Sequence, residues 1–391
     1  MPRSARALAL LLLLAFGAPL CAAPSVGLVT MGPGEEYWAR FGHNAVLIDR
    51  GDGSEPTSYN FGYFDFEQPG FLARFLRGEM RYLAVALPAS VDLRSYAAEG
   101  RGARVQWLEL QPEQIDRLAA ALAEHVRPEN AEYRYDYFVA NCSTKLRDAL
   151  DDALGGALKR QLDGRSQGLT YRFEALRHAA GVHWLHLGVH LGLGPYADRP
   201  LSIWEQTFIP SQLANALREV RLTDGRPLVR EERELLPQKM ATAAPAPADW
   251  RQPALLLGLL LAVAVFLGAR SRAAGWMLIA FWGVSGMMGL GLALLWFGTA
   301  HESAWANRNL LLFNPLALLL LPASVRLLRH GRSPQHSRLR HAATALAVLA
   351  IAGAVIAQVQ VYPQQQLEWL LLMLPAVLAL ALGLRQPLGP A

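Results

Sequence analysis

Cys142 is the residue whose type and position most clearly indicate chemistry. It follows Asn141, and residues 142–150 have the pattern of a helix. Asn141 is a preferred N-cap residue, so Cys142 is predicted in the first turn, where unpaired N–H groups and the helix dipole favour a thiolate. Asn141 is expected to act as the helix cap or to help hold an oxyanion. The helix start alone is equally compatible with Cys142 as a small buried apolar residue.

A cysteine nucleophile needs a base within hydrogen-bonding reach. His43 is the best candidate among the ten histidines, because it opens a predicted strand directly after Gly42, where a ring can face an opening. A third group usually orients the imidazole. Asn60, on the predicted returning strand, is the first choice for that role, and Asp65 is the second.

The composition divides the chain into three parts. Hydrophobic residues make up 52% of the 391 residues and charged residues 18%, and the apolar excess lies before residue 24 and after residue 252. The net charge of +5 comes largely from arginines that flank apolar segments. The positive-inside rule explains such placement, so nucleic acid is not an expected partner.

The first 23 residues have the three parts of a signal peptide. Arg3 and Arg6 precede an apolar run at 7–16, and Cys21 begins a Cys-Ala-Ala step after which cleavage is predicted. The mature chain should therefore begin near Pro24 without an N-terminal lipid. Cys142 would then be the sole cysteine of an exported protein, a context in which thiols are usually paired, and this favours a reactive thiol.

The central part, 24–240, is predicted to be an α+β domain. Residues 49–57 are rich in Gly, Asp, Ser and Pro, which is typical of a hairpin loop. Residues 112–126 show helical periodicity with a proline at the start, whereas the polar stretch 218–239 shows none. Strands are predicted at 25–31, 41–48, 58–64, 80–87 and 103–110, short helices at 71–78 and 112–126, and an Ala/Pro linker at 241–252.

The remaining part, 253–391, is predicted to be an all-α membrane domain of five transmembrane helices. Arginines concentrate in the two predicted inner loops, whereas the outer loops at 298–309 and 362–366 contain only Arg308. This asymmetry predicts a bacterial inner-membrane protein with its soluble domain in the periplasm. The predicted spans are 253–269, 275–297, 310–325, 342–361 and 370–384.

Several segments resemble the Lnb N-terminal periplasmic domain family: RFGHNAVLI, YNFGYFDF, FLRGEMRYL, YFVANCSTKLRDAL and GLGPYADRPLSIWEQTFIPSQL. The resemblance covers most of residues 25–220. It implies a membrane enzyme that remodels the acyl chains of bacterial lipoproteins into a lyso form. The order of His43 before Cys142 is also similar to circularly permuted papain-like enzymes, which pass acyl groups through a cysteine thioester. The resemblance therefore implies Cys142 as nucleophile and His43 as base.

Four further residues are candidates for contact with a substrate. Asp198 and Arg199 fall in the last family-like segment, and His301 and Asn307 lie in a predicted outer loop near lipid head groups. An ion-pair or capping role is the favoured interpretation for the first two. A helix face carrying His183, His186 and His190 resembles a metal site, but no carboxylate or cysteine lies nearby in sequence. No metal and no cofactor are therefore expected.

Three functions remain open. The first is a cysteine acyltransferase that acts on lipid or lipoprotein acyl chains, which the five predicted spans favour because such a substrate resides in the bilayer. The second is an NlpC-type cell-wall peptidase or amidase, which uses the same Cys and His chemistry. The third is a non-catalytic envelope binding module in which Cys142 is merely buried.

Overall fold

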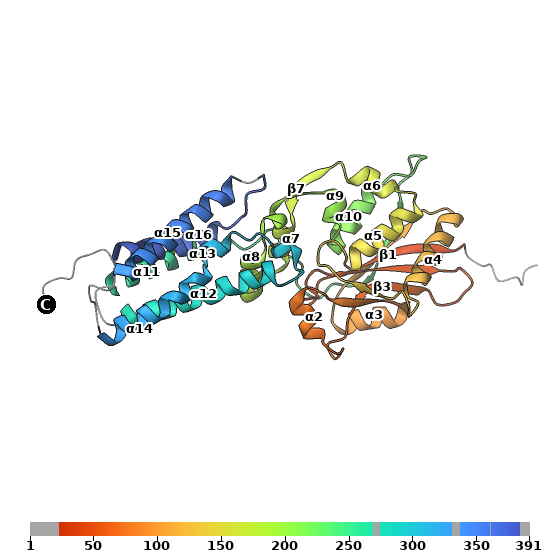
Figure 1. Ribbon diagram of the computed structural model, residues 1–391. Helices are drawn as coiled ribbons and strands as arrows, with labels where there is room; N and C mark the ends of the chain where they lie inside the picture. Colours follow the sequence, from red (N-terminus) through yellow and green to blue (C-terminus); the bar gives the residue numbers. More distant parts are fainter. Residues whose placement is uncertain (1–22, 269–273, 331–336, 360, 384–391) are drawn as a thin grey trace, which may run out of the picture.

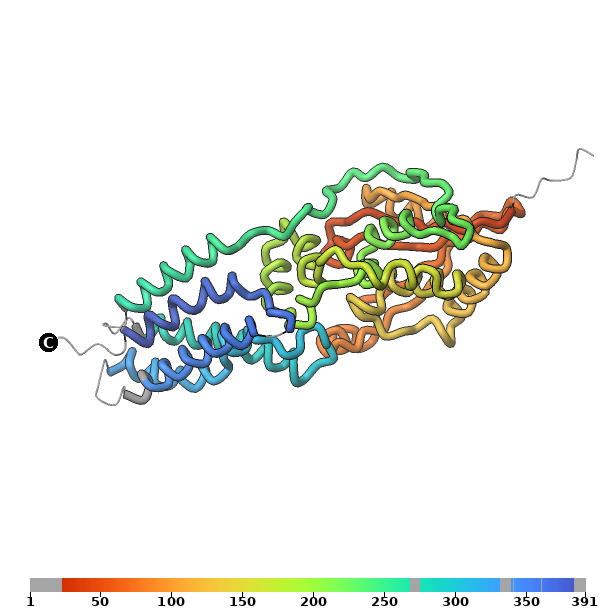
Figure 2. Tube along the Cα trace, turned by 90° about the horizontal axis from the view of Figure 1, so that it is seen from above, coloured from red at the N-terminus to blue at the C-terminus, as the bar shows by residue number. Residues whose placement is uncertain are grey.

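The computed structural model describes residues 23–268, 274–330, 337–359 and 361–383. An α+β domain forms one end of the elongated molecule and a bundle of long helices forms the other (Figures 1 and 2). The predicted signal peptide, including Cys21, lies outside the described residues apart from Ala23.

A seven-stranded antiparallel sheet is the centre of the α+β domain, in the order β6-β4-β3-β2-β1-β5-β9. The central strands β1 and β2 are buried along almost their whole length, because both faces of the sheet are covered. The strands are β1 (Ser25–Met31), β2 (His43–Asp49), β3 (Thr57–Tyr63), β4 (Arg81–Pro88), β5 (Ala103–Leu108), β6 (Glu132–Arg134) and β9 (Val229–Leu236), with β7 (Ser166–Thr170) and β8 (Pro200–Ser202) in a separate pair.

Alternation along β2 sends its side chains into two different cores. Val46 and Ile48 pack in a core with the helix that begins at Cys142, whereas Ala45 and Leu47 pack on the opposite face, in the core that includes Ala89. The helices of this domain are α2 (Phe71–Arg77), α3 (Ala89–Ala98), α4 (Pro112–His125), α5 (Cys142–Ala153), α6 (Ala157–Leu162), α7 (Tyr171–His178), α8 (His183–Gly192), α9 (Ile203–Gln206) and α10 (Pro210–Glu219).

The prediction of an α+β domain followed by a helical domain is confirmed, but several elements were not predicted, among them β6, β7, β8, β9 and α3. Strand β9 lies in the polar stretch 218–239, because an edge strand with mostly exposed side chains carries no apolar alternation. Strand β7 occupies a glycine-containing stretch that has only weak strand character. Helix α3, which has only two buried residues, likewise lacks a pronounced apolar stripe.

The helical domain contains fewer long apolar helices than the five predicted. Among the described residues, three helices are long and apolar enough to cross a membrane: Gly275–Phe297, Asn309–His330 and His341–Gln358. The other two apolar helices, Arg251–Leu267 and Leu367–Leu382, have fewer than 18 residues. At 1.5 Å per residue their described residues cover about 25 Å, and both helices run up to the end of a described range. The elements are α11 (Arg251–Gly268), α12 (Ala274–Phe297), η2 (Glu302–Ala304), α13 (Asn309–Leu312), η3 (Pro315–Leu320), α14 (Leu321–His330), α15 (Ser337–Gln358) and α16 (Leu367–Gly383).

The loop that follows α12 joins the helical domain to the α+β domain. The N–H of Gly194 donates to the carbonyl of Ser303 at 2.8 Å, and the N–H of Ala300 donates to the carbonyl of Arg77 at 2.7 Å. A Cβ at Gly194 would lie only 2.1 Å from the carbonyl oxygen of Trp305. Glycine is therefore required where the two backbones meet.

We expect Gly194→Ala to loosen this contact, because the added methyl group forces the two backbones apart and costs about 1–3 kcal/mol. Gly188→Ala is the matched control, since no atom lies within 4 Å of its added Cβ and the position is in an exposed part of α8. Thermal unfolding of the full-length protein in detergent should show a lower Tm for Gly194→Ala and no loss for Gly188→Ala. Equal Tm values for the two variants would contradict a close contact between Gly194 and the loop that follows α12.

Candidate active site

Asn141 fixes the start of α5 with every polar atom of its side chain. Its Oδ1 accepts the N–H groups of Ser143 and Thr144, both at 2.9 Å, and its own N–H donates to Oγ1 of Thr144 at 2.9 Å. Its Nδ2 donates to the carbonyls of Tyr137 and Phe208, also at 2.9 Å. Asn141 is thus the helix cap, and its amide has no hydrogen left for an oxyanion.

Cys142 is half-buried at the first position of α5. The backbone N–H groups of Asn44 and Ser143 favour its thiolate and lower the pKa of Cys142, although the N–H of Ser143 also donates to Oδ1 of Asn141. Strand β3 passes close to Cys142: a Cβ built at Gly62 would lie 3.7 Å from Cβ of Cys142. Gly62 has a φ of 92° at the point where the register between β3 and β4 shifts, so a glycine suits the close approach.

His43 begins β2 and is hydrogen-bonded to the side chain of Cys142. Its Nε2 lies 2.9 Å from Oδ1 of Asn60, on the neighbouring strand. Because Oδ1 can only accept, Nε2 carries the proton and Nδ1 is left to face the thiol. The sheet and helix thus bring together Cys142, His43 and Asn60, in the order expected of a nucleophile, a base and an orienting group.

Asp92 on α3 stands behind Asn60. Its Oδ2 accepts from Nδ2 of Asn60 at 3.0 Å and from Oγ of Ser58 at 2.5 Å, and all three side chains are buried. Asp65, the second choice for orienting His43, is instead exposed in the turn after β3 and accepts from the N–H of Glu67. Sequence reasoning missed Asp92 because α3 itself was not predicted.

Cys142 and His43 shift each other's pKa. Burial alone would raise the pKa of Cys142 and lower that of His43, because it disfavours charge. The mutual attraction and hydrogen bond outweigh burial, so the pKa of Cys142 lies below its ordinary value and the pKa of His43 above its own. Asn60 and the charge of Asp92 also raise the pKa of His43. The arrangement favours a thiolate–imidazolium pair.

Aromatic residues that sequence reasoning did not select surround this pair. The rings of His43 and Tyr96 are stacked with centroids 6.1 Å apart. The hydroxyl of Tyr133 is buried and lies 3.9 Å from the position of a Cβ at Gly62, whose backbone N–H interacts with it.

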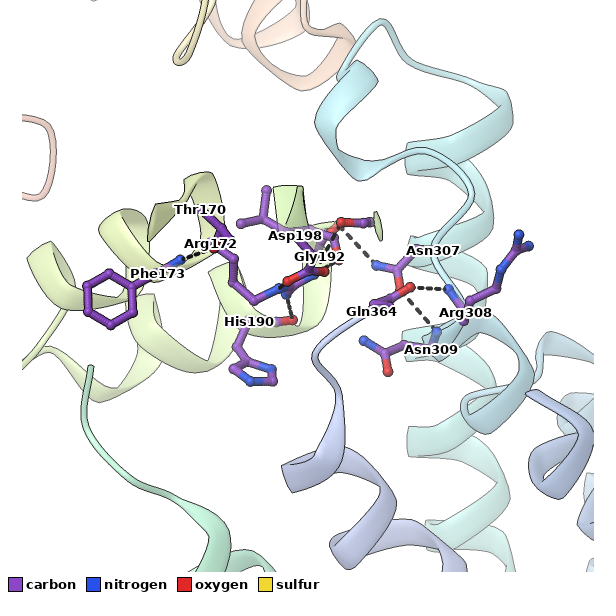
Figure 3. A network of polar contacts seen from close by, with 12 residues as sticks. Thr170, Arg172, Phe173, His190, Gly192, Asp198, Asn307, Arg308, Asn309 and Gln364 are labelled. Atoms are coloured by element: carbon purple, nitrogen blue, oxygen red, sulfur yellow. Dashed lines mark hydrogen bonds and ion pairs between the residues drawn. The ribbon is translucent and has the colours of Figure 1, made fainter. Parts of the chain in front are cut away.

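Two of the predicted substrate-side residues serve structure instead (Figure 3). Both carboxylate oxygens of Asp198 bind Arg172, at 2.7 and 2.9 Å, and neither side chain is exposed. Asn307 donates to the carbonyls of Leu191 and Gly192 and accepts from Gln364 at 2.8 Å. These contacts use the polar atoms that would otherwise meet a ligand.

The other two predicted residues also lie apart from the Cys142–His43 pair. Arg199 binds Glu205 at 2.6 Å and lies over the ring of Tyr196, as the ion-pair interpretation expected. His301 stacks on Tyr137 at 6.2 Å, and its Nε2 is 3.0 Å from the carbonyl oxygen of Phe75. Desolvation lowers the pKa of His301, so the ring is neutral near pH 7.

The histidine face of α8 packs against the helical domain. His190 accepts a hydrogen bond from Nε1 of Trp369 at 2.7 Å, and its Nε2 lies 3.2 Å from Glu368. A carboxylate distant in sequence is thus close in space, which the local pattern could not reveal. Within the described ranges, no three His, Cys, Asp or Glu residues form a group able to hold a metal.

An antiparallel α+β domain with a cysteine–histidine pair, docked on long apolar helices, defines a membrane-anchored protein with a separate soluble site. Two family models match the chain: the Lnb N-terminal periplasmic domain at residues 21–174 and the Lnb transmembrane domain at 249–385. The chain therefore belongs to the Lnb family. It is an inner-membrane protein whose soluble domain lies in the periplasm. No curated protein and no solved structure matches it.

The pKa shifts predict the pH range in which Cys142 is alkylated. Because the pKa of Cys142 is lowered, the side chain stays a thiolate until the pH falls below that pKa. Iodoacetamide should therefore alkylate Cys142 at a lower pH than an ordinary thiol, whose pKa is about 8.5. In His43→Ala only burial and the two N–H groups remain, and the midpoint should move to higher pH. Identical midpoints in the two proteins would show that His43 does not stabilise the thiolate.

Asp92 should act through the orientation and charge of His43. Asp92→Ala leaves the donors of Ser58 and Asn60 without their acceptor, which should cost about 1–3 kcal/mol and slow alkylation. Asp92→Asn keeps an acceptor oxygen but removes the charge that raises the pKa of His43. NMR titration of the His43 ring should therefore give a lower pKa in Asp92→Asn with little change in Tm. An unchanged His43 pKa would exclude this role.

Proposed function

We propose that the protein is a periplasmic cysteine acyltransferase, anchored in the inner membrane, that acts on lipid or lipoprotein acyl chains through a thioester on Cys142. The observation that carries this proposal is the hydrogen-bonded series Cys142–His43–Asn60 at the start of a capped helix. Membership of the Lnb family, whose resemblance implies lipoprotein acyl remodelling, supports the choice of substrate class.

The first half of the reaction forms the thioester. The thiolate of Cys142 attacks the acyl carbonyl carbon, a C–S bond forms, and the carbonyl electron pair moves to oxygen. The N–H group of Asn44 and the hydroxyl of Tyr133 are the candidate donors to this oxyanion. The intermediate then collapses, the bond from the acyl carbon to the donor oxygen or nitrogen breaks, and His43 gives its proton to the leaving group.

The second half returns the enzyme to its starting state. An acceptor hydroxyl, amine or water molecule loses a proton to neutral His43 as it attacks the thioester carbonyl. The C–S bond breaks, and the released thiolate of Cys142 pairs again with the imidazolium. Asn60, held by Asp92 and Ser58, keeps the ring in the tautomer that both halves need.

We further propose a permuted papain-like arrangement for the α+β domain. A histidine on a central strand precedes a helix that begins with the cysteine, and the helix packs on the sheet beside that strand. The aromatic surroundings of Cys142 and the apolar helical domain favour an acyl chain over a cell-wall peptide as substrate.

Cys142→Ser and His43→Ala should each abolish acyl transfer while the Tm stays within a few degrees of wild type. Because the two residues act as a unit, the double variant should be no less active than either single one. Mass spectrometry of wild-type protein incubated with phospholipid vesicles and quenched in acid should find an acyl adduct on Cys142, which is absent from Cys142→Ser.

Three outcomes would contradict the proposal. If the adduct forms in Cys142→Ser, the thioester assignment fails. If wild-type protein forms no adduct with lipid but cleaves peptidoglycan fragments in a Cys142-dependent way, the protein is an NlpC-type hydrolase instead. A thiol that is alkylated only after unfolding would favour a binding module.

A further inference from the structure

Exposed apolar side chains gather around helix α2. None of the residues 71–77 of this helix, all of them described, is buried. Leu72 is 66% exposed and Leu76 60% exposed, and Phe66 just before the helix is 52% exposed. Trp38 and Trp184, from two other segments, are exposed as well. We call these five residues the apolar patch. Exposed apolar groups that cluster in this way mark a contact surface rather than an ordinary protein surface.

The position of α2 identifies what covers the apolar patch. The backbone at the end of α2 is bonded to the loop that directly follows the span Gly275–Phe297, through Ala300 N–H and the carbonyl of Arg77. A Cβ at Gly78 would lie 2.8 Å from the backbone of Ala300 and His301, so the two segments are in contact. Figure 1 shows α2 beside the end of α12. The patch therefore lies at the level where a membrane span ends.

The composition of the region fits the boundary between head groups and acyl chains. Tryptophan is enriched at that boundary, and Trp38 and Trp184 both contact the ring of Tyr37, at 4.6 and 6.1 Å. Arg74 and Arg77 lie in the last turn of α2, which has no acidic residue in its first turn. Basic side chains beside apolar ones attract anionic phospholipids.

A row of aromatic rings connects α2 to the catalytic centre. Tyr135, whose ring lies 3.6 Å from the position of a Cβ at Gly62 beside Cys142, is 4.4 Å from Tyr82. Tyr82 stacks on Phe64 at 4.9 Å, and Phe64 stacks on Phe71 of α2 at 6.1 Å. The rings are thus in contact with one another from α2 to the surroundings of the thiol, and Tyr82 within the row is buried.

We propose that α2 and the apolar patch dock into the outer leaflet of the membrane that holds this protein, and that the aromatic row from Phe71 to Tyr135 guides an acyl chain from this leaflet to Cys142. The docking stands on the geometry of α2 alone. The guidance of an acyl chain rests on the proposed function.

Docking is tested by the depth of a probe on α2. In a Cys21→Ser, Cys142→Ser background, the thiol of Leu72→Cys is labelled with a fluorophore, and the full chain is reconstituted in vesicles of phosphatidylethanolamine and phosphatidylglycerol. Lipids with a spin label near the head group should quench this fluorophore strongly. Ala120→Cys is the control, because it is exposed on α4, far from the helical domain. Equal quenching at both sites would overturn the docking.

Delivery of the acyl chain is tested separately, with Cys142 intact. Leu72→Asp combined with Leu76→Asp should lower the rate of acyl-adduct formation from vesicles about tenfold or more, because charged side chains resist burial in lipid. The rate of Cys142 alkylation by iodoacetamide, a small water-soluble reagent, should stay unchanged, and Ala120→Asp should change neither rate. Normal adduct formation in the double variant would overturn this role.

The two proposals fail in different ways. If wild-type protein forms no adduct while the probe at position 72 is quenched, the acyltransferase assignment fails and the membrane docking stands. If wild-type protein forms the adduct while the probe is not quenched, the docking fails and the chemistry stands.

Discussion

The cap that Asn141 places on α5 is the interaction on which the rest of the candidate site depends. One side chain binds two N–H groups of the helix start and two carbonyls, those of Tyr137 and Phe208, from segments that lie apart in sequence. It therefore holds the start of α5, the aromatic stretch before it and the turn before α10 together. Because Asn141 is buried, loss of its amide would leave several polar groups without partners.

The cysteine and the histidine belong to opposite sides of the sheet. Cys142 comes from the helix that packs with Val46 and Ile48, whereas the ring of His43 stacks on Tyr96 from the helix on the other face. They meet only because His43 is the first residue of β2, where the sheet ends. Because of this position, Asn60 and Asp92, on the α3 side of the sheet, contact or influence His43, and His43 in turn faces the thiol on the α5 side.

A second buried network fixes the α+β domain to the helical domain. Arg172 binds Asp198 and the carbonyls of His190 and Leu193, at the end of α8 (Figure 3). Asn307 of the outer loop binds the carbonyls of Leu191 and Gly192 in the same turn. The placement of the α+β domain on the helical domain is thus fixed by residues other than Cys142, His43 and Asn60.

Local patterns in the sequence were enough to predict the helix start at Cys142, the strands that carry His43 and Asn60, the hairpin between them and the division into soluble and membrane parts. These features depend on N-cap chemistry, period-two alternation and long apolar runs, all of which act between near neighbours. Tertiary structure alone decided the role of Asp92, since its partners Ser58 and Asn60 lie on another element. It also decided that Asp198 binds Arg172 and that Asn307 joins the two domains, because a polar side chain shows its role only through partners distant in the chain.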